Sequence, residues 1–366
     1  MNKTIQSPAE TAETAPRQLQ QDTPPRTRDE LHDYVKTFLD LQVPDRRICP
    51  EHASPMDYLW HSFSIDSAPR TGPREPADSP AEVRHGDVIV WANRGGGKTQ
   101  IAAVATLLDA IFKPGCQIRI LGGSGVQSLR MFEYLDTFLR RGYEEDIAGE
   151  IRKGRCRFTN GALVEILKQS QTSVRGTHVQ KLRCDEVELF REEVFAAAKF
   201  TTQSTDTIVA AMELISTLHQ PYGLMQREVT AATSAGVPLF KWCVWETIEK
   251  CVDRTCSQCP LSNDCEGRAK SACGYLKIDD CITQMRRSSR PGWESEMLCL
   301  RPSRENVVFA DFDPDVHVRP VDYNPNLPLY RTLDFGFVNP FVCLWLQVDP
   351  EGLVEPQAHE GDRKST

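Results

Sequence analysis

Apolar residues in the middle of the chain follow two alternating spacings. Short apolar runs at 87–91, 117–121 and 181–184 have the length and composition of buried strands. Between the first two runs, residues 99–112 carry apolar side chains at helical spacing and stop before a Pro-Gly pair. Strands that alternate with amphipathic helices over residues 51–240 predict an α/β fold, in which helices flank a mainly parallel sheet.

The pattern changes on both sides of this region. Residues 1–50 are polar and proline-rich, which predicts a largely disordered N-terminal arm that is interrupted by a helical patch from Leu31 to Leu41. Residues 241–300 hold most of the thirteen cysteines and are expected to form a metal-binding linker. Residues 301–366 return to strand-like runs, notably at 330–334 and 341–348, and end in a polar tail.

Composition narrows the class of protein. The chain has 366 residues, of which 40% are hydrophobic, so it can bury a core. It contains no apolar run long enough to span a membrane, and its N-terminus lacks the apolar segment of a secretory signal. Thirteen cysteines without such a signal favour an intracellular protein with free thiols and one metal cluster. The net charge of −8 argues against a uniformly basic nucleic-acid binder but allows a local basic groove.

The segment 92–99 connects a predicted strand to a predicted helix. It matches the phosphate-loop pattern G-x-x-x-x-G-K-[ST] except that Ala92 replaces the first glycine. Consecutive glycines let backbone N–H groups surround a polyphosphate at a helix N-terminus. We expect Lys98 to neutralise the β and γ oxygens of ATP and Thr99 to hold Mg²⁺. The alternative is a glycine-rich turn with a coincidental Lys-Thr pair. The positions expected to contact the nucleotide are Ala92, Asn93, Arg94, Gly95, Gly96, Gly97, Lys98 and Thr99.

An acidic pair, Asp185 and Glu186, ends the predicted strand near residue 184. In a phosphate-loop ATPase, a carboxylate at such a strand end holds Mg²⁺ and a second one polarises the attacking water. We therefore expect Asp185 to bind the metal and Glu186 to act as the catalytic base. A solvated acidic loop is the alternative, because further glutamates follow closely. The position of the pair downstream of the phosphate loop, as in a phosphate-loop ATPase, favours a catalytic role.

Several segments resemble phage terminase large subunits. Residues 173–178 with 181–186 are similar to the segment that precedes the acidic pair in that family, and residues 121–124 resemble its motif after the first helix. The resemblance implies that Arg94 senses or stabilises the γ-phosphate. Residues 215–219 resemble the coupling motif, which implies that Ser216 and Thr217 transmit hydrolysis to the DNA-gripping parts; an ordinary strand end is the alternative.

The family resemblance implies a function and partners. A terminase large subunit uses ATP and Mg²⁺ to translocate double-stranded viral DNA into a procapsid. The implied partners are double-stranded DNA, a portal ring, a small terminase subunit and further copies of the chain, all in the host cell cytoplasm, with no membrane. Two alternatives stay open: a helicase-like DNA-dependent ATPase, and an inactive prophage remnant that binds nucleotide without turning it over.

The cysteine-rich segment predicts a metal site. Cys251, Cys256, Cys259 and Cys265 lie in polar sequence, and the two-residue gap lets two thiolates converge on one ion. Zinc and an iron–sulfur cluster both suit this spacing, and four unrelated buried thiols are the alternative. We expect the metal to be structural, because the surrounding residues cannot supply a core. The nearby arginines are candidates for contact with DNA phosphates or form a solvated basic face: Arg286, Arg287, Arg290, Arg301 and Arg304.

Residues 330–340 resemble the first strand of the terminase nuclease domain, which has an RNase H-like fold. The resemblance implies that Asp334 binds a catalytic metal, although an aspartate that caps a turn is the alternative. Cleavage with two metals needs several carboxylates from different strands. The acidic residues after Asp334 lie in sequence that looks like loop or tail, so we expect an incomplete nuclease.

Overall fold

The computed structural model describes residues 21–64, 86–176, 178–221, 223–302, 323–334, 342–348 and 354–358. The chain divides into two compact units, Met1–Ser303 and Arg304–Thr366. Within the described ranges, no helix combines the length and the apolar character that a membrane span requires.

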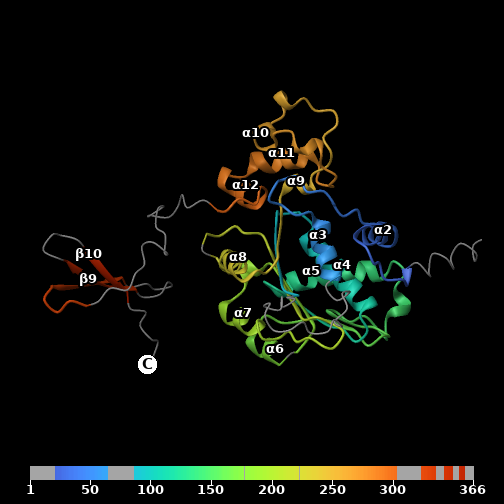
Figure 1. Cartoon of the computed structure of the whole chain (residues 1–366), viewed down its shortest axis with the longest axis horizontal. Helices are drawn as coiled ribbons and strands as arrows, with labels where there is room; N and C mark the ends of the chain where they lie inside the picture. The colour runs from blue at the N-terminus through green and yellow to red at the C-terminus, as the bar shows by residue number, and fades with distance from the viewer. Residues whose placement is uncertain are drawn as a thin grey trace, which may run out of the picture. The chain divides into compact units, whose positions relative to one another are not determined.

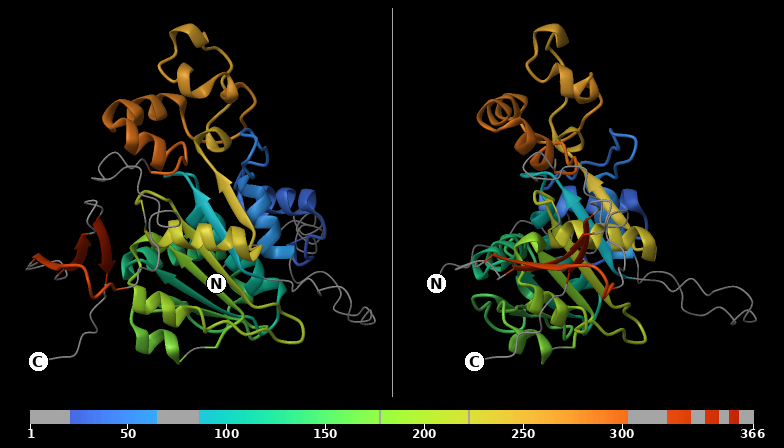
Figure 2. Two further views of the ribbon diagram at one scale, coloured as in Figure 1. Left: turned by 60° about the vertical axis from the view of Figure 1, so that its left-hand side comes forward. Right: turned by 90° about the vertical axis from the view of Figure 1, so that its left-hand side faces the viewer.

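A seven-stranded sheet forms the centre of the first unit, with the strand order β3-β4-β2-β5-β6-β1-β7. Every neighbouring pair is parallel except β3 and β4, so the predicted mainly parallel sheet is confirmed. Figure 2 shows this twisted sheet with helices around it. The strands are β1 (Val88–Ala92), β2 (Gln117–Gly122), β3 (Arg155–Arg157), β4 (Leu163–Ile166), β5 (Lys181–Asp185), β6 (Ala211–Ser216) and β7 (Leu239–Trp242).

Two apolar cores lie on the two faces of this sheet. Successive side chains of a strand point to opposite faces, so Val88 and Val90 of β1 enter one core while Ile89 and Trp91 enter the other. The first core is covered by α2 (Arg28–Leu39), α3 (Pro55–Ser64), α4 (Lys98–Phe112) and α5 (Gly125–Leu139). The second is covered by α6 (Gln171–Arg175), α7 (Glu192–Ala198) and α8 (Leu224–Ala235) (Figure 1).

Helix α2 corrects the prediction for the N-terminal region. The sequence predicts a largely disordered arm over residues 1–50 with a helical patch from residue 31, but the helix begins at Arg28 and belongs to the core. Thr27 caps it by accepting a hydrogen bond from the backbone N–H of Glu30. Leu31, Val35 and Leu39 recur at helical spacing and are fully buried. This apolar stripe, rather than the polar composition around it, decides the structure.

The cysteine-rich segment packs directly against the second core. Trp245 and Trp293 are almost completely buried there, together with residues of β1 and α8. The segment is therefore part of the first unit rather than a separate linker. Its helices are α9 (Val244–Thr247), α10 (Ser262–Cys265), α11 (Ile278–Arg287) and α12 (Arg290–Glu296). Short 3-10 turns occur at η1 (Glu144–Asp146), η2 (Val187–Leu189), η3 (Cys256–Gln258) and η4 (Arg268–Lys270).

The second unit contains a three-stranded antiparallel sheet with the order β10-β9-β8. Its strands are β8 (Leu329–Asp334), β9 (Val342–Val348) and β10 (Val354–Ala358). Strands β8 and β9 lie where the sequence predicts them. Glu355 differs from the prediction, because it lies on β10 rather than in a loop. Asp334 is the last residue of β8 and pairs with Val342 through the backbone.

Candidate nucleotide-binding site

The loop between β1 and α4 is built on glycine. Gly97 caps the N-terminus of α4 with φ 76°, a left-handed conformation that other residues adopt only with strain. A Cβ atom on Gly96 would lie 2.3 Å from Asn93 Oδ1, which is far too close. The loop therefore needs these glycines to turn its backbone N–H groups toward one point at the N-terminus of α4. This is the geometry of a site for phosphate groups.

Residues of β7 and α9 hold the loop from behind. The indole N–H of Trp242 donates to the carbonyl of Gly96 (3.0 Å), and the backbone N–H of Asn93 donates to the carbonyl of Trp242 (3.2 Å). The hydroxyl of Thr247 donates to Asn93 Oδ1 (3.4 Å). Asn93 and Ala92 are fully buried. The Asn93 side chain thus supports the loop through Thr247, and contact of Ala92 and Asn93 with a nucleotide stays a prediction.

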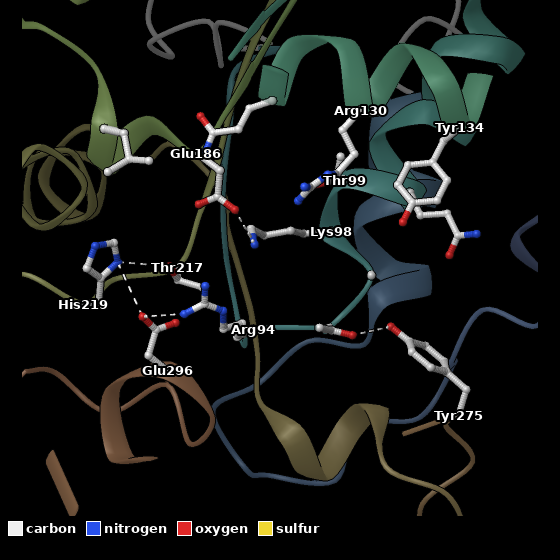
Figure 3. A pocket seen from close by; sticks show the side chains of 16 residues that line it. Arg94, Lys98, Thr99, Arg130, Tyr134, Glu186, Thr217, His219, Tyr275 and Glu296 are labelled. Carbon is white, nitrogen blue, oxygen red and sulfur yellow. Dashed lines mark hydrogen bonds and ion pairs between the residues drawn. The ribbon is translucent and has the colours of Figure 1, made fainter. Parts of the chain in front are cut away.

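The predicted acidic pair lies directly opposite the loop. Lys98 Nζ is 3.0 Å from Glu186 Oε1, and the Thr99 hydroxyl donates to Asp185 Oδ2 over 2.9 Å. Figure 3 shows the ammonium group of Lys98 directed at the Glu186 carboxylate. Asp185 is the last residue of β5, and Glu186 turns the chain with φ 56°. The structure thus brings together four residues that the sequence singled out in two segments more than eighty positions apart.

Asp185 is a buried carboxylate that suits a hard cation. Only 2% of the residue is exposed. Burial raises its pKa to about 6, although the neighbouring Lys98 ammonium acts in the opposite direction. Among the residues that the structure describes, its Oδ1 atom has no hydrogen-bond partner. An unpartnered carboxylate oxygen beside a threonine hydroxyl offers the oxygen ligands that Mg²⁺ prefers.

A cavity of about 560 Å³ opens between the loop and Glu186. Helix α5 contributes Gln127, Arg130 and Tyr134 to its wall, and the cysteine-rich segment contributes Tyr275 and Glu296. Arg130 and Tyr134 are one helical turn apart, so they lie on the same face of α5 (Figure 3). Sequence reasoning missed these five residues. The four-residue spacing of Arg130 and Tyr134 was a signal in the sequence that could have placed them on one face of α5. Tyr275 and Glu296 gave no such signal, because only the tertiary fold brings them to the site.

A chain of polar contacts links the loop to the end of β6. The Thr217 hydroxyl lies 3.1 Å from His219 Nδ1, and the same nitrogen is 4.0 Å from Glu296 Oε1. Arg94 approaches that carboxylate oxygen at 3.8 Å (Figure 3). Of the predicted coupling pair, Thr217 thus lines the cavity. Ser216 does not, because it is buried and its hydroxyl accepts a hydrogen bond from the backbone N–H of Glu188 (3.3 Å).

The four cysteines predicted to bind a metal surround one small cavity. Cys251, Cys256, Cys259 and Cys265 all line a space of about 20 Å³, which has room for a single ion or water. The backbone N–H of Ala269 donates to Cys265 Sγ (3.4 Å). Within the described part of the chain, however, the group whose ligand atoms all lie within 4.8 Å of one another is a different one. Metal binding by these four cysteines stays a prediction.

Asp334, the predicted nuclease residue, belongs to the second unit. Only its backbone is described, at the end of β8, and its side chain lies outside the described residues. The nucleotide site itself is formed by residues of the first unit. A metal role for Asp334 therefore stays a prediction.

Comparison with solved structures identifies the fold. The large terminase of bacteriophage HK97 matches with a TM-score of 0.54 at 14% identity, over 90% of this chain and 67% of that one. The chain has the fold of a phage large terminase. A large terminase from a thermophilic bacteriophage gives a TM-score of 0.46 at 15% identity, over 79% of this chain and 65% of that one. This chain therefore spans about two thirds of the length of either terminase.

The ATPase domain of the Thermus phage P74-26 large terminase is also similar. Its TM-score is 0.36 at 10% identity, and the match covers 64% of this chain and 95% of that domain. No protein-family model matches the sequence. No curated protein matches it either. The terminase likeness is therefore a likeness of fold.

Proposed function

We propose that this chain is the motor ATPase of a phage terminase large subunit, which hydrolyses ATP with Mg²⁺ to move double-stranded DNA into a procapsid. The observation that carries the proposal is the meeting of two segments across one cavity. Lys98 lies 3.0 Å from Glu186, and Thr99 lies 2.9 Å from Asp185. A lysine, a threonine and two carboxylates around a glycine-built helix N-terminus are the groups that Mg–ATP hydrolysis needs.

Each residue has a defined task in this proposal. The backbone N–H groups of residues 95–97 and the N-terminus of α4 bind the phosphates, and Lys98 neutralises the β and γ oxygens. Thr99 and Asp185 would hold Mg²⁺, which would offset the charge of the transferred phosphoryl group. Lys98 is paired with Glu186 in the structure. When Lys98 turns to the γ-phosphate, Glu186 is released to orient and polarise the attacking water.

Coupling runs through the contacts at the rim of the cavity. Arg94 and His219 share the carboxylate of Glu296, and Thr217 contacts His219. In our proposal Arg94 senses the γ-phosphate and exchanges Glu296 for it. Because Glu296 ends α12, this exchange would change the position of the cysteine-rich segment. Ser216 then serves as a support at the end of β6 rather than as a sensor.

The DNA contacts are proposed on exposed arginines of the cysteine-rich segment. Arg286 and Arg287 end α11 and are exposed, as is Arg301. Arg290 is already paired with Asp264 at 2.8 Å and with Glu294 at 2.6 Å, so it is a weaker candidate. Arg304 lies outside the described residues. A portal ring, a small terminase subunit and further copies of this chain are the proposed partners in the host cytoplasm.

We further propose that β8, β9 and β10 begin an RNase H-like nuclease domain in which Asp334 binds a catalytic metal. Two-metal cleavage needs several converging carboxylates. In the described parts of the second unit, the acidic residues are Asp334 and Glu355. Most acidic residues after Asp334 lie in sequence that looks like loop or tail, so we expect this chain by itself to lack endonuclease activity. Zinc or an iron–sulfur cluster at Cys251, Cys256, Cys259 and Cys265 is proposed to stabilise the cysteine-rich segment.

The test is an ATPase assay on the purified full chain with and without double-stranded DNA. We expect Mg²⁺-dependent turnover that duplex DNA stimulates, and no strand separation. Lys98→Ala should abolish turnover without changing the fold, whereas Lys36→Ala, an exposed lysine on α2, should leave it unchanged. Turnover by Lys98→Ala would refute the site. Strand separation would favour a helicase-like enzyme, and a folded wild-type chain without turnover would indicate an inactive remnant.

A further inference from the structure

A second cluster of ligand-type side chains lies apart from the nucleotide cavity. One ligand atom each from Cys49, His52, Cys243 and Glu246 lies within 4.8 Å of the others. Cys49 and His52 belong to the segment between α2 and α3, whereas Cys243 and Glu246 follow β7. The two halves are 194 positions apart, so no local spacing in the sequence reveals the cluster.

The two sulfurs have the separation of two thiolates on one zinc ion. Cys49 Sγ and Cys243 Sγ are 3.8 Å apart. A tetrahedral zinc with Zn–S bonds of about 2.3 Å places two sulfurs about 3.8 Å from each other. A disulfide would need an S–S distance of about 2.0 Å. The geometry therefore fits a shared ion better than a covalent bond.

Glu246 orients the cluster. Its Oε2 accepts hydrogen bonds from the backbone N–H of Cys243 (2.8 Å) and from His52 Nδ1 (2.9 Å). Its Oε1 accepts from the backbone N–H of Cys49 (2.7 Å) and of Ile48 (3.3 Å). These four bonds use the lone pairs of both oxygens, so the carboxylate has no capacity left for a metal. Donation from Nδ1 leaves the lone pair of His52 on Nε2, and a carboxylate behind a metal-binding histidine fixes the ring in this way.

Solvent can reach the cluster, although most of it is buried. Cys243 and Glu246 are almost fully buried, and 8% of the His52 side chain is exposed. A cavity of about 470 Å³ has Cys49, His52 and Cys243 in its wall. An ion can thus enter from this cavity.

We propose that Cys49, Cys243 and His52 bind one zinc ion, with Glu246 as the residue that positions His52. The ion would join the segment before α3 to the end of β7. Cys243 directly follows Trp242, whose indole N–H holds the carbonyl of Gly96 in the phosphate loop. The site is separate from the cavity of Cys251, Cys256, Cys259 and Cys265.

Zinc content of the purified full chain tests the proposal. The measurement uses a background variant, Cys256→Ser/Cys259→Ser, in which the other cysteine set is disrupted. We expect the background chain to keep one zinc per chain, and Cys49→Ser or Cys243→Ser in that background to lower it at least tenfold. Cys273→Ser is the matched control, because its thiol contacts Asp45 of the same N-terminal segment and serine can keep that hydrogen bond. The control should keep its zinc.

Cobalt substitution gives a second measurement, which does not depend on whether the Cys49 and Cys243 variants fold. The background chain should show thiolate-to-cobalt charge transfer with the intensity of two sulfurs. Glu246→Gln should weaken the affinity roughly 10- to 100-fold while leaving this spectrum unchanged. A background chain without bound zinc and without the cobalt spectrum would overturn the proposal. So would a Cys49–Cys243 disulfide in the chain as purified, or full zinc content in folded Cys49→Ser.

Discussion

The hydroxyl of Tyr275 donates a hydrogen bond to the carbonyl of Gly95 over 3.0 Å. The contact joins the cysteine-rich segment to the phosphate loop, as Figure 3 shows. Gly95 has φ 70° and precedes the glycines that shape the loop. The tyrosine therefore fixes one carbonyl of the loop from outside while Trp242 fixes the next from behind.

Loss of this bond should loosen the loop before nucleotide binds. For Tyr275→Phe we expect a rise of about two- to tenfold in KM for ATP, since one neutral hydrogen bond contributes about 0.5–1.5 kcal/mol. Steady-state kinetics measure the effect. Tyr34→Phe is the matched control, because it removes a buried hydroxyl that contacts Tyr143 far from the loop. It should lower stability and leave KM unchanged, and an equal KM in both variants would contradict the role of Tyr275.

Glu186 should act in catalysis and not in binding. We expect Glu186→Gln to lower kcat by about 10²- to 10⁴-fold, the range for loss of a general base. ATP binding should persist, because Lys98 and Thr99 are unchanged. Glu193→Gln alters a half-exposed glutamate in the same acidic stretch and should have no effect on kcat. Equal activity of the two variants would support a solvated acidic loop instead.

Asp185 should make the stability of the nucleotide-free chain depend on pH. Its folded pKa of about 6 lies above the unfolded value of about 3.9. Between these two values the folded chain binds the proton more tightly, so the free energy of unfolding falls as pH rises from about 4 to 6. A pKa difference of about 2 corresponds to about 3 kcal/mol.

Asp185→Asn removes this dependence. At pH 7 the variant should be more stable than the wild-type chain by up to about 3 kcal/mol, yet it should lose Mg²⁺-dependent turnover. Denaturant unfolding without nucleotide at pH 4 and pH 7 measures the first effect. If the variant is less stable than the wild-type chain at pH 7, the attraction between Asp185 and Lys98 outweighs the cost of burying the carboxylate.

A buried ionic network should contribute strongly to the first unit. The guanidinium of Arg183 contacts Asp109 Oδ2 at 2.5 Å and Glu213 Oε2 at 3.1 Å, and both carboxylates are almost completely buried. Glu213 also accepts hydrogen bonds from the hydroxyls of Tyr58 and Ser62, both at 2.6 Å. For Arg183→Met we expect a loss of about 3–5 kcal/mol, because the buried carboxylate of Glu213 loses the cation that pairs with it and Asp109 keeps only its ion pair with Lys113.

The network variant has a simple control. Arg140→Met breaks an exposed pair with Asp136 that spans one helical turn, and such pairs contribute only a few tenths of a kcal/mol. Chemical denaturation of both variants measures the contrast. Similar unfolding free energies for both variants would mean that the buried network makes no net contribution to stability.

The chain should not cut DNA. We expect neither the wild-type chain nor Asp334→Asn to cleave a plasmid with Mn²⁺, because two-metal cleavage needs carboxylates from several strands and most acidic residues after Asp334 lie in sequence that looks like loop or tail. Gel electrophoresis of incubated plasmid is the measurement. Cleavage by the wild-type chain and not by Asp334→Asn would reverse this expectation.

The sequence predicted features that local chemistry determines. The strands near residues 88, 117 and 181 are apolar runs that the sequence reveals directly. The phosphate loop and the acidic pair each follow one of these strands, so a parallel sheet brings both to the same edge. Tyr275 and Glu296 could not be predicted, because only the packing of the cysteine-rich segment brings them to the loop. The same holds for Cys49 and Cys243, which have no common sequence pattern.

The misjudged N-terminal region has a related cause. The average composition of residues 1–50 is polar, so the sequence predicted disorder around the helical patch at 31–41, although the apolar stripe of Leu31, Val35 and Leu39 belongs to a helix that begins at Arg28. A helix needs only one buried face. Periodicity within a short window was the better guide there than composition over fifty residues.

Strand β6 lies between β5 and β1 in the sheet, although it follows both of them in the chain. Its end therefore has the carboxylates of β5 on one flank and the glycine turn of β1 on the other. In the proposed ATPase, Thr217 at this end of β6 would therefore face the bound phosphates from a position between the metal-binding and the phosphate-binding segments.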